Sequence, residues 1–404
     1  MKTLLMAPAA YNLAETTRML EIARTSRDFF DVHFLSFGGQ FEQLIHDAGF
    51  PVHELEPRLT PAKIEHIYKL DKGEKLGVMF TVDEINQRIS QEMALLNTLK
   101  PATVITGFSL TIPLSTRIQG TPLVWVVQST WLKETGMGMV PANAFGIFRP
   151  LIINLISFFA DFASRVIMLG PVNRVARQHN VQTYRGFADF ITGQENLLAE
   201  PPMFSDLNIP TPHHHLIGPL IAREDYPIPP EVNNIPHDLP IIYFAMGSSG
   251  TPEIVAEILQ GFEGKPYRVI APIRNLIKQL QVNIPSNVIV TDYLPAHEVN
   301  PMADLSLIHG GIGTVMTAAQ AGKPVVGIGM QPEQDANIKC LVRKGFAIRI
   351  PKRKADRKTV MAAVEKMINN EQAKHKAEEY AKQIEPWDGP GRAAAFLHER
   401  FGDK

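Results

Sequence analysis

Apolar residues along the chain follow two alternating patterns, short continuous runs and helical spacing. In the first half, the runs occur at residues 3–7, 32–36, 103–106 and 123–127. In the second half, they occur at residues 241–245, 267–270, 288–290, 305–308, 325–328 and 347–350. Segments with the helical period lie between them, as at Ile85, Ile89, Met93, Leu96 and Leu99. Short buried strands that alternate with helices predict an α/β protein with parallel sheets.

The length of the chain predicts more than one domain. At 404 residues it is longer than one hydrophobic core usually serves, so we expect two domains of about 200 residues each. Prolines are dense between residues 201 and 240, which is typical of a stiffened linker. The linker would separate the runs of the first half from those of the second.

A glycine-rich turn follows the apolar run at 305–308. It reads His309-Gly310-Gly311-Ile312-Gly313-Thr314, and a segment with helical spacing comes next. Glycines let backbone N–H groups approach a bound group closely, and the start of a helix favours a phosphate. His309 and the Thr314 hydroxyl would add hydrogen bonds. The alternative is a tight turn that merely uses glycine.

A second polar pair is expected at the same edge of this sheet. Glu333 and Gln334 follow the run at 325–328, and ligands of open parallel sheets bind at the carboxyl ends of the strands. A carboxylate beside an amide suits a polyhydroxyl group. A diphosphate linked to a sugar would satisfy both the turn and this pair.

A longer set of residues resembles the donor signature of nucleotide-sugar glycosyltransferases. The set is Tyr293-Leu294-Pro295, His309-Gly310-Gly311-x-Gly313-Thr314, Ala318, Gly322-x-Pro324 and Glu333-Gln334-x-x-Asn337. It is most similar to bacterial, macrolide-type members of the UDP-glycosyltransferase family. Tyr293 stands where the family usually has tryptophan, and Ala296 stands where it has glutamine. The resemblance covers the second half well and the first half only in layout.

The resemblance implies the GT-B fold, with two Rossmann-like parallel-sheet domains facing a cleft. Residues 1–220 would bind the acceptor, 221–240 would form the linker, and 241–385 would bind the nucleotide sugar. Residues 386–404 would form a helix that crosses back to the first domain. In this scheme Gly247, Ser248 and the glycine turn lie near the diphosphate. Tyr293 would stack on the base, and Leu294 would also belong to the donor site.

The activity implied is an inverting transfer of a hexose from a UDP- or TDP-sugar to a hydrophobic or phenolic small molecule. No cofactor is implied, and no pair of aspartates stands at a strand end to hold a metal ion. Two alternatives are a protein that binds a nucleotide sugar without transferring it and a nucleotide-sugar epimerase of the same fold.

The catalytic base of the family is missing from its usual place. Asn12 occupies the position of the usual histidine, and Gly107 occupies that of the aspartate which orients it. Asparagine has no useful basic form. Either Glu15 turns inward as the base, or the acceptor is acidic enough to need little help. The spacing from Asn12 to Glu15 also fits a helix-capping box, the use we expect for Glu15.

Exposed apolar residues among glycines predict an adaptable acceptor pocket in the loop at 128–145. They are Trp131, Met137, Met139 and Phe145. Ordinary packing of the loop against its domain is the alternative.

The net charge, the cysteine count and the first residues of the chain limit the partners and the compartment that we expect. A net charge of −1 gives no electrostatic argument for nucleic acid, and the single cysteine excludes an internal disulfide. The first residues lack the pattern of a secretory signal, so we expect a cytoplasmic protein. Residues 150–169 predict a buried amphipathic helix, with contact at a membrane surface as the lesser alternative. The adjacent histidines 213–215 lack the spacing of metal ligands.

Overall fold

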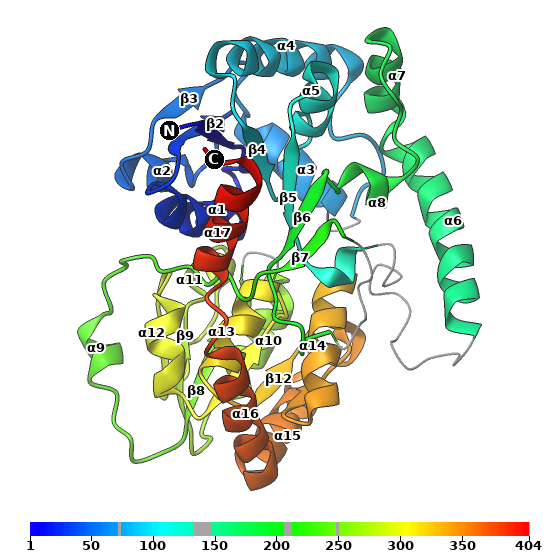
Figure 1. Cartoon of the computed structure of the whole chain (residues 1–404). Coiled ribbons are helices and arrows are strands. Elements are labelled where there is room, and N and C mark those ends of the chain that lie inside the picture. Colours follow the sequence, from blue (N-terminus) through cyan, green and yellow to red (C-terminus); the bar gives the residue numbers. More distant parts are fainter. Residues whose placement is uncertain (72–73, 133–147, 206–211, 248–249, 404) are drawn as a thin grey trace. The chain divides into compact units, whose positions relative to one another are not determined.

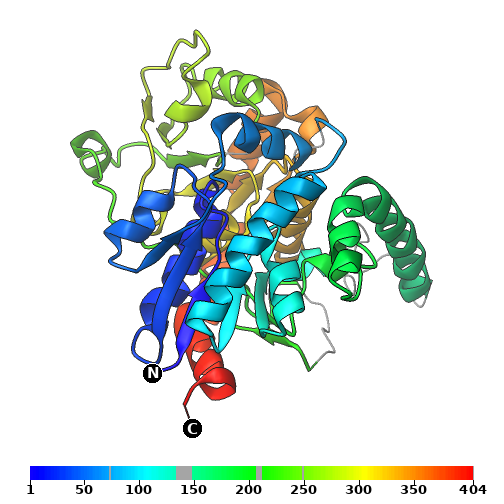
Figure 2. The same cartoon turned by 90° about the horizontal axis from the view of Figure 1, so that it is seen from above.

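The computed structural model describes residues 1–71, 74–132, 148–205, 212–247 and 250–403. The chain divides into two compact units. Unit 1 comprises Met1–Pro201, Leu207–Leu220 and Asp388–Lys404, and unit 2 comprises Pro202–Asp206 and Ile221–Trp387. Each unit contains one parallel sheet with helices packed on it, which confirms the predicted α/β class (Figures 1 and 2).

Unit 1 is built on a seven-stranded sheet with the order β3-β2-β1-β4-β5-β6-β7. Its strands are β1 (Thr3–Met6), β2 (Asp31–Ser36), β3 (Val52–Glu54), β4 (Thr103–Thr106), β5 (Leu123–Val127), β6 (Glu195–Leu198) and β7 (His214–Leu216). Every neighbouring pair is parallel. Strand β6 was not predicted, because Glu195 and Asn196 interrupt its apolar run.

Helices cover both faces of this sheet. They are α1 (Leu13–Ser26), α2 (Glu42–Asp47), α3 (Pro61–Asp71), α4 (Val82–Leu99), α5 (Ile112–Gln119), α6 (Arg149–Ile167), α7 (Gly170–Gln178), α8 (Phe187–Phe190) and α17 (Gly389–Phe401). Because side chains alternate along a strand, Leu4 packs on the α1 and α17 face, whereas Leu5 packs on the α4, α5 and α7 face.

The last helix of the chain lies beside the first. Ala393 and Leu397 of α17 are buried with Met19 and Leu20 of α1, and the Thr25 hydroxyl donates to the Pro390 carbonyl at 3.0 Å. Figure 1 shows the two helices, blue and red, side by side. Residues of both ends of the sequence therefore complete one core.

Helix α6 is not buried, so the expectation for residues 150–169 was wrong. Leu151, Leu155, Phe158, Phe159 and Phe162 are each between 52% and 66% exposed. They recur at the helical period, and the stripe they form faces away from the core of unit 1. No single helix in the described ranges is long and apolar enough to cross a membrane, although the bent pair Leu151–Ile167 and Gly170–Gln178 passes on combined length and composition.

Unit 2 is built on a six-stranded parallel sheet with the order β10-β9-β8-β11-β12-β13. Its strands are β8 (Ile241–Ala245), β9 (Arg268–Ala271), β10 (Val288–Val290), β11 (Leu305–Ile308), β12 (Val325–Gly327) and β13 (Ala347–Arg349). Its helices are α9 (Pro230–Asn233), α10 (Pro252–Gln260), α11 (Arg274–Ile277), α12 (Ala296–Val299), α13 (Ile312–Gln320), α14 (Pro332–Lys344), α15 (Arg357–Ile368) and α16 (Glu371–Ile384).

The proline-rich segment at 221–240 packs onto unit 2. Val232 and Ile235 are buried in one cluster with Ile241 and Tyr243 of β8. The segment therefore contributes side chains to the core of this unit, and short helix α9 lies within it.

Candidate functional site

Three central strands of unit 2 bring the predicted donor residues to one edge. β8, β11 and β12 are neighbours in the sheet, so their carboxyl ends lie side by side. The loop after β8 contains Gly247, the loop after β11 contains the glycine turn, and α14 begins after β12. Ser248 lies outside the described residues.

His309 is seated between two glycines of this edge. A Cβ added to Gly247 would lie 2.6 Å from the His309 Cε1, and one added to Gly311 would lie 2.6 Å from its Nε2. Gly247 also has a φ of +55°, which other residues rarely adopt. Glycine at 247 and 311 is therefore required for the histidine ring to fit.

The buried position of His309 fixes its protonation. Loss of solvation lowers its pKa to about 4, although contact with the Ala245 carbonyl opposes this shift. Nδ1 lies 3.4 Å from that carbonyl oxygen, so the neutral tautomer that donates there leaves Nε2 as an acceptor. His309 is thus a neutral side chain at pH 7, with Nε2 beside the start of α13.

Gly310 allows α14 to approach the turn. Its φ is +91°, and an added Cβ would lie 2.6 Å from the Gln334 carbonyl oxygen. The Asn337 amide donates to the Gly310 carbonyl at 3.1 Å, which holds the turn against α14. An added Cβ at Gly313, in contrast, would meet nothing within 4 Å. Gly310 is constrained by packing, whereas Gly313 faces open space.

The start of α13 has N–H groups available for an anion. Gly311 is its N-cap residue, and among the described residues no side chain caps this end. The first intrahelical backbone bond runs from the Val315 N–H to the Gly311 carbonyl, at 2.9 Å. The N–H groups of residues 312–314 precede that bond and point out of the helix, together with the positive end of its dipole. Thr314 is half-buried in this first turn.

The other predicted donor residues have distinct places. Gln334 is buried: its Oε1 accepts from the Met330 N–H at 3.0 Å, and its Nε2 donates to the Gln331 side chain at 2.8 Å. Glu333 is half-buried in the first turn of α14. Tyr293 is 38% exposed and stacks on Tyr226 with ring centroids 6.2 Å apart. Leu294 is buried in the cluster around β8.

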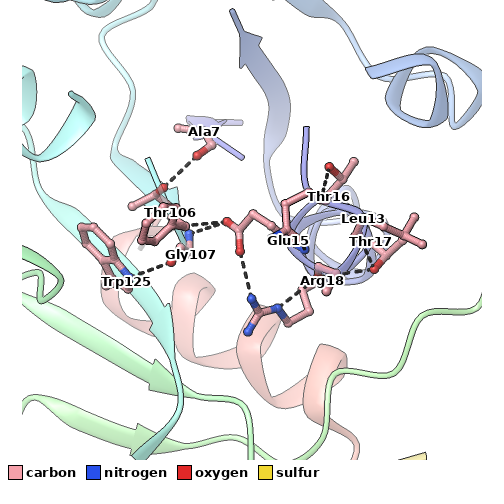
Figure 3. Close-up of polar contacts among 12 residues, drawn as sticks. Ala7, Leu13, Glu15, Thr16, Thr17, Arg18, Thr106, Gly107 and Trp125 are labelled. Carbon is pink, nitrogen blue, oxygen red and sulfur yellow. Dashed lines mark hydrogen bonds and ion pairs between the residues drawn. The ribbon is translucent and has the colours of Figure 1, made fainter. Parts of the chain in front are cut away.

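In unit 1, Glu15 does not complete a capping box, contrary to our expectation. Asn12 does cap α1, because its Oδ1 accepts from the Glu15 N–H at 3.2 Å. The Glu15 side chain instead turns to the end of β4, where Oε1 accepts from the N–H groups of Gly107 at 2.8 Å and Phe108 at 2.9 Å (Figure 3). Two backbone donors and a buried site outweigh the weaker return bond to Asn12.

The Glu15 carboxylate occupies the place that a side chain at position 107 would fill. A Cβ added to Gly107 would overlap both of its oxygens. Oε2 accepts from Arg18 at 3.1 Å, and the Gly107 carbonyl accepts from the Trp125 indole at 2.9 Å (Figure 3). Burial raises the pKa of Glu15, while Arg18 and the two backbone N–H groups act against that rise.

A pocket lies at the carboxyl edge of the sheet in unit 1. The ends of β1, β2 and β4 line it, and its apolar wall consists of Leu35, Phe37, Leu59, Phe80, Phe108 and Leu110. Arg88 of α4 is the only charged residue among the described residues that line it. The sequence analysis did not identify this pocket. Its one local signal was the position of Arg88 and Glu92 within the apolar stripe of α4.

Of the residues predicted to bind the acceptor, Trp131 alone lies in the described ranges. Its ring contacts Phe108 edge-on, with centroids 6.3 Å apart, and Phe187 at 5.7 Å. Trp131 therefore packs against a residue of the pocket wall without lining the pocket itself. Met137, Met139 and Phe145 lie outside the described residues.

Metal-ligand geometry occurs once in the described part of the chain, and it includes none of the predicted donor residues. Glu42, His46 and Glu54 of unit 1 bring ligand atoms within 4.8 Å of one another. Glu42 also accepts from the Ser36 hydroxyl and pairs with Arg58, so its oxygens already have partners. The glycine turn of unit 2 belongs to no such group.

Comparison with known proteins agrees with this geometry. A family model described as the C-terminal domain of erythromycin biosynthesis protein CIII-like proteins matches residues 266–391. A PGL/p-HBAD biosynthesis glycosyltransferase of Mycobacterium tuberculosis (strain ATCC 25177 / H37Ra) is 26% identical over 396 residues, which are 95% of this chain and 89% of its own.

Solved structures of glycosyltransferases share the fold over the whole length. VinC, solved in complex with DTDP, is 18% identical with a TM-score of 0.69, and the match covers 98% of each chain. The spinosyn rhamnosyltransferase SpnG, solved with spinosyn aglycone, is 14% identical with a TM-score of 0.69, covering 98% of this chain and 100% of its own. The chain is a glycosyltransferase with the GT-B fold, as the donor signature predicted.

Proposed function

We propose that the protein transfers a hexose from a UDP- or TDP-sugar to a hydrophobic or phenolic small molecule, with inversion at the anomeric carbon. The observation that carries the proposal is the uncapped start of α13 beside His309, at the carboxyl edge of the sheet in unit 2. Parallel sheets bind ligands at this edge, and helix starts bind phosphates. The structures of VinC in complex with DTDP and of SpnG with spinosyn aglycone support the two substrate classes.

In this proposal the diphosphate lies on the N–H groups of residues 312–314. Gly313 leaves open space for it, and the Thr314 hydroxyl lies in the same turn. Glu333 would hold hydroxyl groups of the hexose, while Gln334 would act mainly by fixing the loop through Met330 and Gln331. Gly247 and Ser248 would complete the phosphate side of the site.

The nucleoside base would lie against Tyr293. Its ring already stacks on Tyr226 at an interplanar angle of 26° and is partly exposed, so one face of the pair offers a flat surface. Leu294 beneath it is part of the buried cluster and would keep the ring in place. Aromatic stacking accepts either a uracil or a thymine, so the two nucleotides remain alternatives.

His309 would recognise the diphosphate only after taking up a proton. Its neutral form donates to Ala245 and leaves Nε2 as an acceptor, which repels a phosphate oxygen. Binding of nucleoside diphosphate would therefore raise the pKa of His309, and affinity would increase as pH falls. His309→Ala is expected to weaken binding and to remove this pH dependence in titration calorimetry; unchanged affinity would exclude His309 from the site.

The chemical step needs one proton to leave the acceptor. The acceptor oxygen attacks the anomeric carbon, the bond from that carbon to the diphosphate breaks, and nucleoside diphosphate leaves with the electron pair. Glu15 would accept the proton only by giving up one of its present donors, because it is 1% exposed and binds Gly107, Phe108 and Arg18. This arrangement favours an acceptor such as a phenol, which loses its proton readily.

Phenols of graded acidity distinguish these two routes. Without a base in the protein, the rate would rise steeply with the acidity of the phenol, and Glu15→Gln would keep that dependence. With Glu15 as the base, Glu15→Gln would lower kcat by about 10²- to 10⁴-fold for weakly acidic phenols and much less for acidic ones. Single-turnover rates with each phenol would give the comparison.

Charge on the leaving diphosphate would be stabilised by the start of α13 and by protonated His309, without a metal ion. We therefore expect full activity in the presence of EDTA. Activity that disappears with EDTA and returns with Mg²⁺ or Mn²⁺ would contradict this arrangement of the donor site.

The decisive experiment is a screen of the purified chain with UDP- and TDP-hexoses against phenolic and hydrophobic acceptors, analysed by mass spectrometry. A product heavier than the acceptor by one hexose residue, with inverted anomeric configuration, is expected. An epimer of the nucleotide sugar formed without acceptor would indicate an epimerase instead. Donor affinity without any product would indicate a binding protein.

A further inference from the structure

The pocket of unit 1 contains a buried guanidinium with an N–H edge that lacks an acceptor. Arg88 is 5% exposed, and its Nη1 has no hydrogen-bond partner among the described residues. Its Nε makes one long contact of 3.4 Å with the Thr111 hydroxyl. Burying a charged group without hydrogen-bond partners is strongly unfavourable, so such a group indicates a place for an anion.

The faces of the guanidinium are already covered. The Phe37 ring centroid lies 3.5 Å from the Arg88 Cζ, and the Phe80 centroid lies 4.7 Å from it. Cation–π contacts of this kind use the faces of the plane and leave its edges free. An edge of a guanidinium matches the two oxygens of a carboxylate in one plane.

Glu92 acts on Arg88 through its charge but does not accept a hydrogen bond from Nη1. Glu92 lies one turn further along α4 and accepts from the Thr111 and Ser115 hydroxyls. Among the described residues, the two side chains are linked only through the Thr111 hydroxyl, which lies 3.4 Å from the Arg88 Nε and donates to Glu92. Burial raises the pKa of Glu92 to about 7, so near neutral pH this side chain holds a proton for much of the time.

The size of the cavity fits the head of a small anion. Its volume of about 20 Å³ is slightly more than one water requires, so it would enclose only the head group of a ligand. A carboxylate of similar width would fit beside Arg88, whereas a phosphate dianion would be larger and would face a single cation. The wall formed by Phe108, Leu35 and Leu110 is apolar, so the rest of the ligand would be apolar as well.

We propose that Arg88 is a specificity-determining residue that binds the carboxylate of an organic acid with an apolar body, and that this acid is the acceptor. The identification of this acid as the acceptor rests on the proposed transferase function. The carboxylate site itself does not depend on that function. A hydroxyl elsewhere on the same molecule would receive the sugar. The Phe108 peptide connects the pocket to Glu15, because its N–H donates to that carboxylate.

The test is titration calorimetry of the full chain without donor, using benzoate and cinnamate, each compared with its uncharged amide. Benzamide and cinnamamide have nearly the same shape as the acids, so a difference reports the charge. We expect at least one of the acids to bind about tenfold or more tightly than its amide, as for a charge-assisted hydrogen-bonded pair. Equal affinities, or no binding of either acid, would overturn the proposal even without a variant.

A variant then assigns the effect to Arg88. Arg88→Met should abolish the preference for the acid while leaving affinity for the amide within about threefold, since methionine keeps much of the apolar stem. Arg117→Met is the matched control, because Arg117 also stacks on an aromatic ring, Tyr184 at 3.8 Å, but does not line the pocket. A preference that persists in Arg88→Met would remove Arg88 from the site.

The double variant Arg88→Met/Glu92→Gln guards against misfolding of the single variant, since it removes both buried titratable groups together. Failure of this proposal and failure of the transferase proposal are distinguishable. Acid binding is measured without nucleotide sugar, so its absence would refute the carboxylate site and leave the transfer untouched. A transferase that glycosylates only neutral phenols would refute the acid as the acceptor and leave the transfer intact.

Discussion

The carboxyl edges of the two sheets carry different kinds of recognition chemistry. In unit 2 the edge consists of backbone, because glycines at 247, 310 and 311 bring N–H groups and one histidine together. In unit 1 the corresponding edge consists of side chains, with Glu15 over the end of β4 and Arg88 in the pocket. A backbone site suits a ligand that related enzymes share, and a side-chain site suits one that differs among them.

The same contrast extends to protonation. His309 in unit 2 has a pKa lowered to about 4 by burial, and Glu92 in unit 1 has a pKa raised to about 7 by burial. Burial favours the neutral form of both groups. His309 becomes charged by gaining a proton at low pH, whereas Glu92 becomes charged by losing one at high pH. The stability of the two units should therefore diverge as pH falls.

The largest expected effect is a difference in stability between alanine variants of two glycines in one turn of unit 2, Gly310 and Gly313. Gly310→Ala places a Cβ 2.6 Å from backbone at a φ of +91°, so we expect a loss of about 4 kcal/mol and no binding of nucleoside diphosphate. Gly313→Ala, the control, meets nothing within 4 Å and should change the free energy of unfolding by less than about 1 kcal/mol. Urea unfolding of both variants would test this; equal stability would mean that the turn adapts.

The next largest effect is the change with pH in the free energy of unfolding of each unit. The unfolded state takes up a proton on His309 below about pH 6.5 that the folded state refuses, so unit 2 should lose about 3 kcal/mol between pH 6.5 and pH 4. The folded state keeps a proton on Glu92 that the unfolded state releases above about pH 4.5. Unit 1 is therefore stabilised by about 3 kcal/mol at low pH, and this contribution is lost as pH rises through 7.

Differential scanning calorimetry at pH 5 and pH 7.5 would detect this divergence as a change in the separation of the two transitions. His309→Asn should flatten the response of unit 2 alone, and Glu92→Gln should flatten that of unit 1 alone. Two transitions that move together in both variants would contradict the assignment.

A smaller effect is expected from the carboxylate that anchors β4. Glu15→Ala removes the acceptor of two backbone N–H groups and leaves them buried, so unit 1 should lose about 2 kcal/mol, while nucleotide binding by unit 2 stays within about twofold. Gly107→Ala in the Glu15→Ala background provides a control, because the added methyl group would enter the space that the carboxylate leaves. Partial recovery of stability is expected, and further loss would show that the 107–108 loop has moved.

The smallest predicted effect concerns the exposed ring beside the donor. Tyr293→Ala should weaken binding of UDP by about fivefold, equal to about 1 kcal/mol, because it removes one partner of the stacked pair with Tyr226. Tyr293→Trp should preserve or improve the affinity, since a larger ring offers more surface to the base. Unchanged affinity in Tyr293→Ala would place the nucleoside elsewhere.

The sequence allowed the donor segment to be predicted closely, because its features are local. Residues 305–308 were predicted as a strand and a helix was predicted after the glycine turn, and the structure has β11 and α13 there. A continuous apolar run or a helical period within one segment fixes such elements. The grouping of Gly310 with Asn337 was also within reach, because both belong to one recognised signature.

Unit 1 was harder to predict because its important contacts join distant segments. Glu15 accepts from the N–H group of Gly107, 92 positions away. Nothing near Glu15 in the sequence indicates that the N–H groups of residues 107 and 108 need an acceptor. The exposed stripe of α6 was predicted to be buried, because its apolar content shows the amphipathic period but not what covers it. Arg88 was passed over, although a charge within an apolar stripe is itself a signal.

The place of α17 in unit 1 has a consequence for how the protein is made. Met19 and Leu20 are buried in one cluster with Ala393 and Leu397, so part of the apolar face of α1 stays uncovered until residues 389–401 have left the ribosome. Unit 2, whose segments end at Trp387, has all of its strands beforehand. Unit 2 can therefore fold during synthesis before unit 1 is complete. A nascent chain stalled before residue 388 would expose the apolar face of α1, a surface of the kind that chaperones recognise.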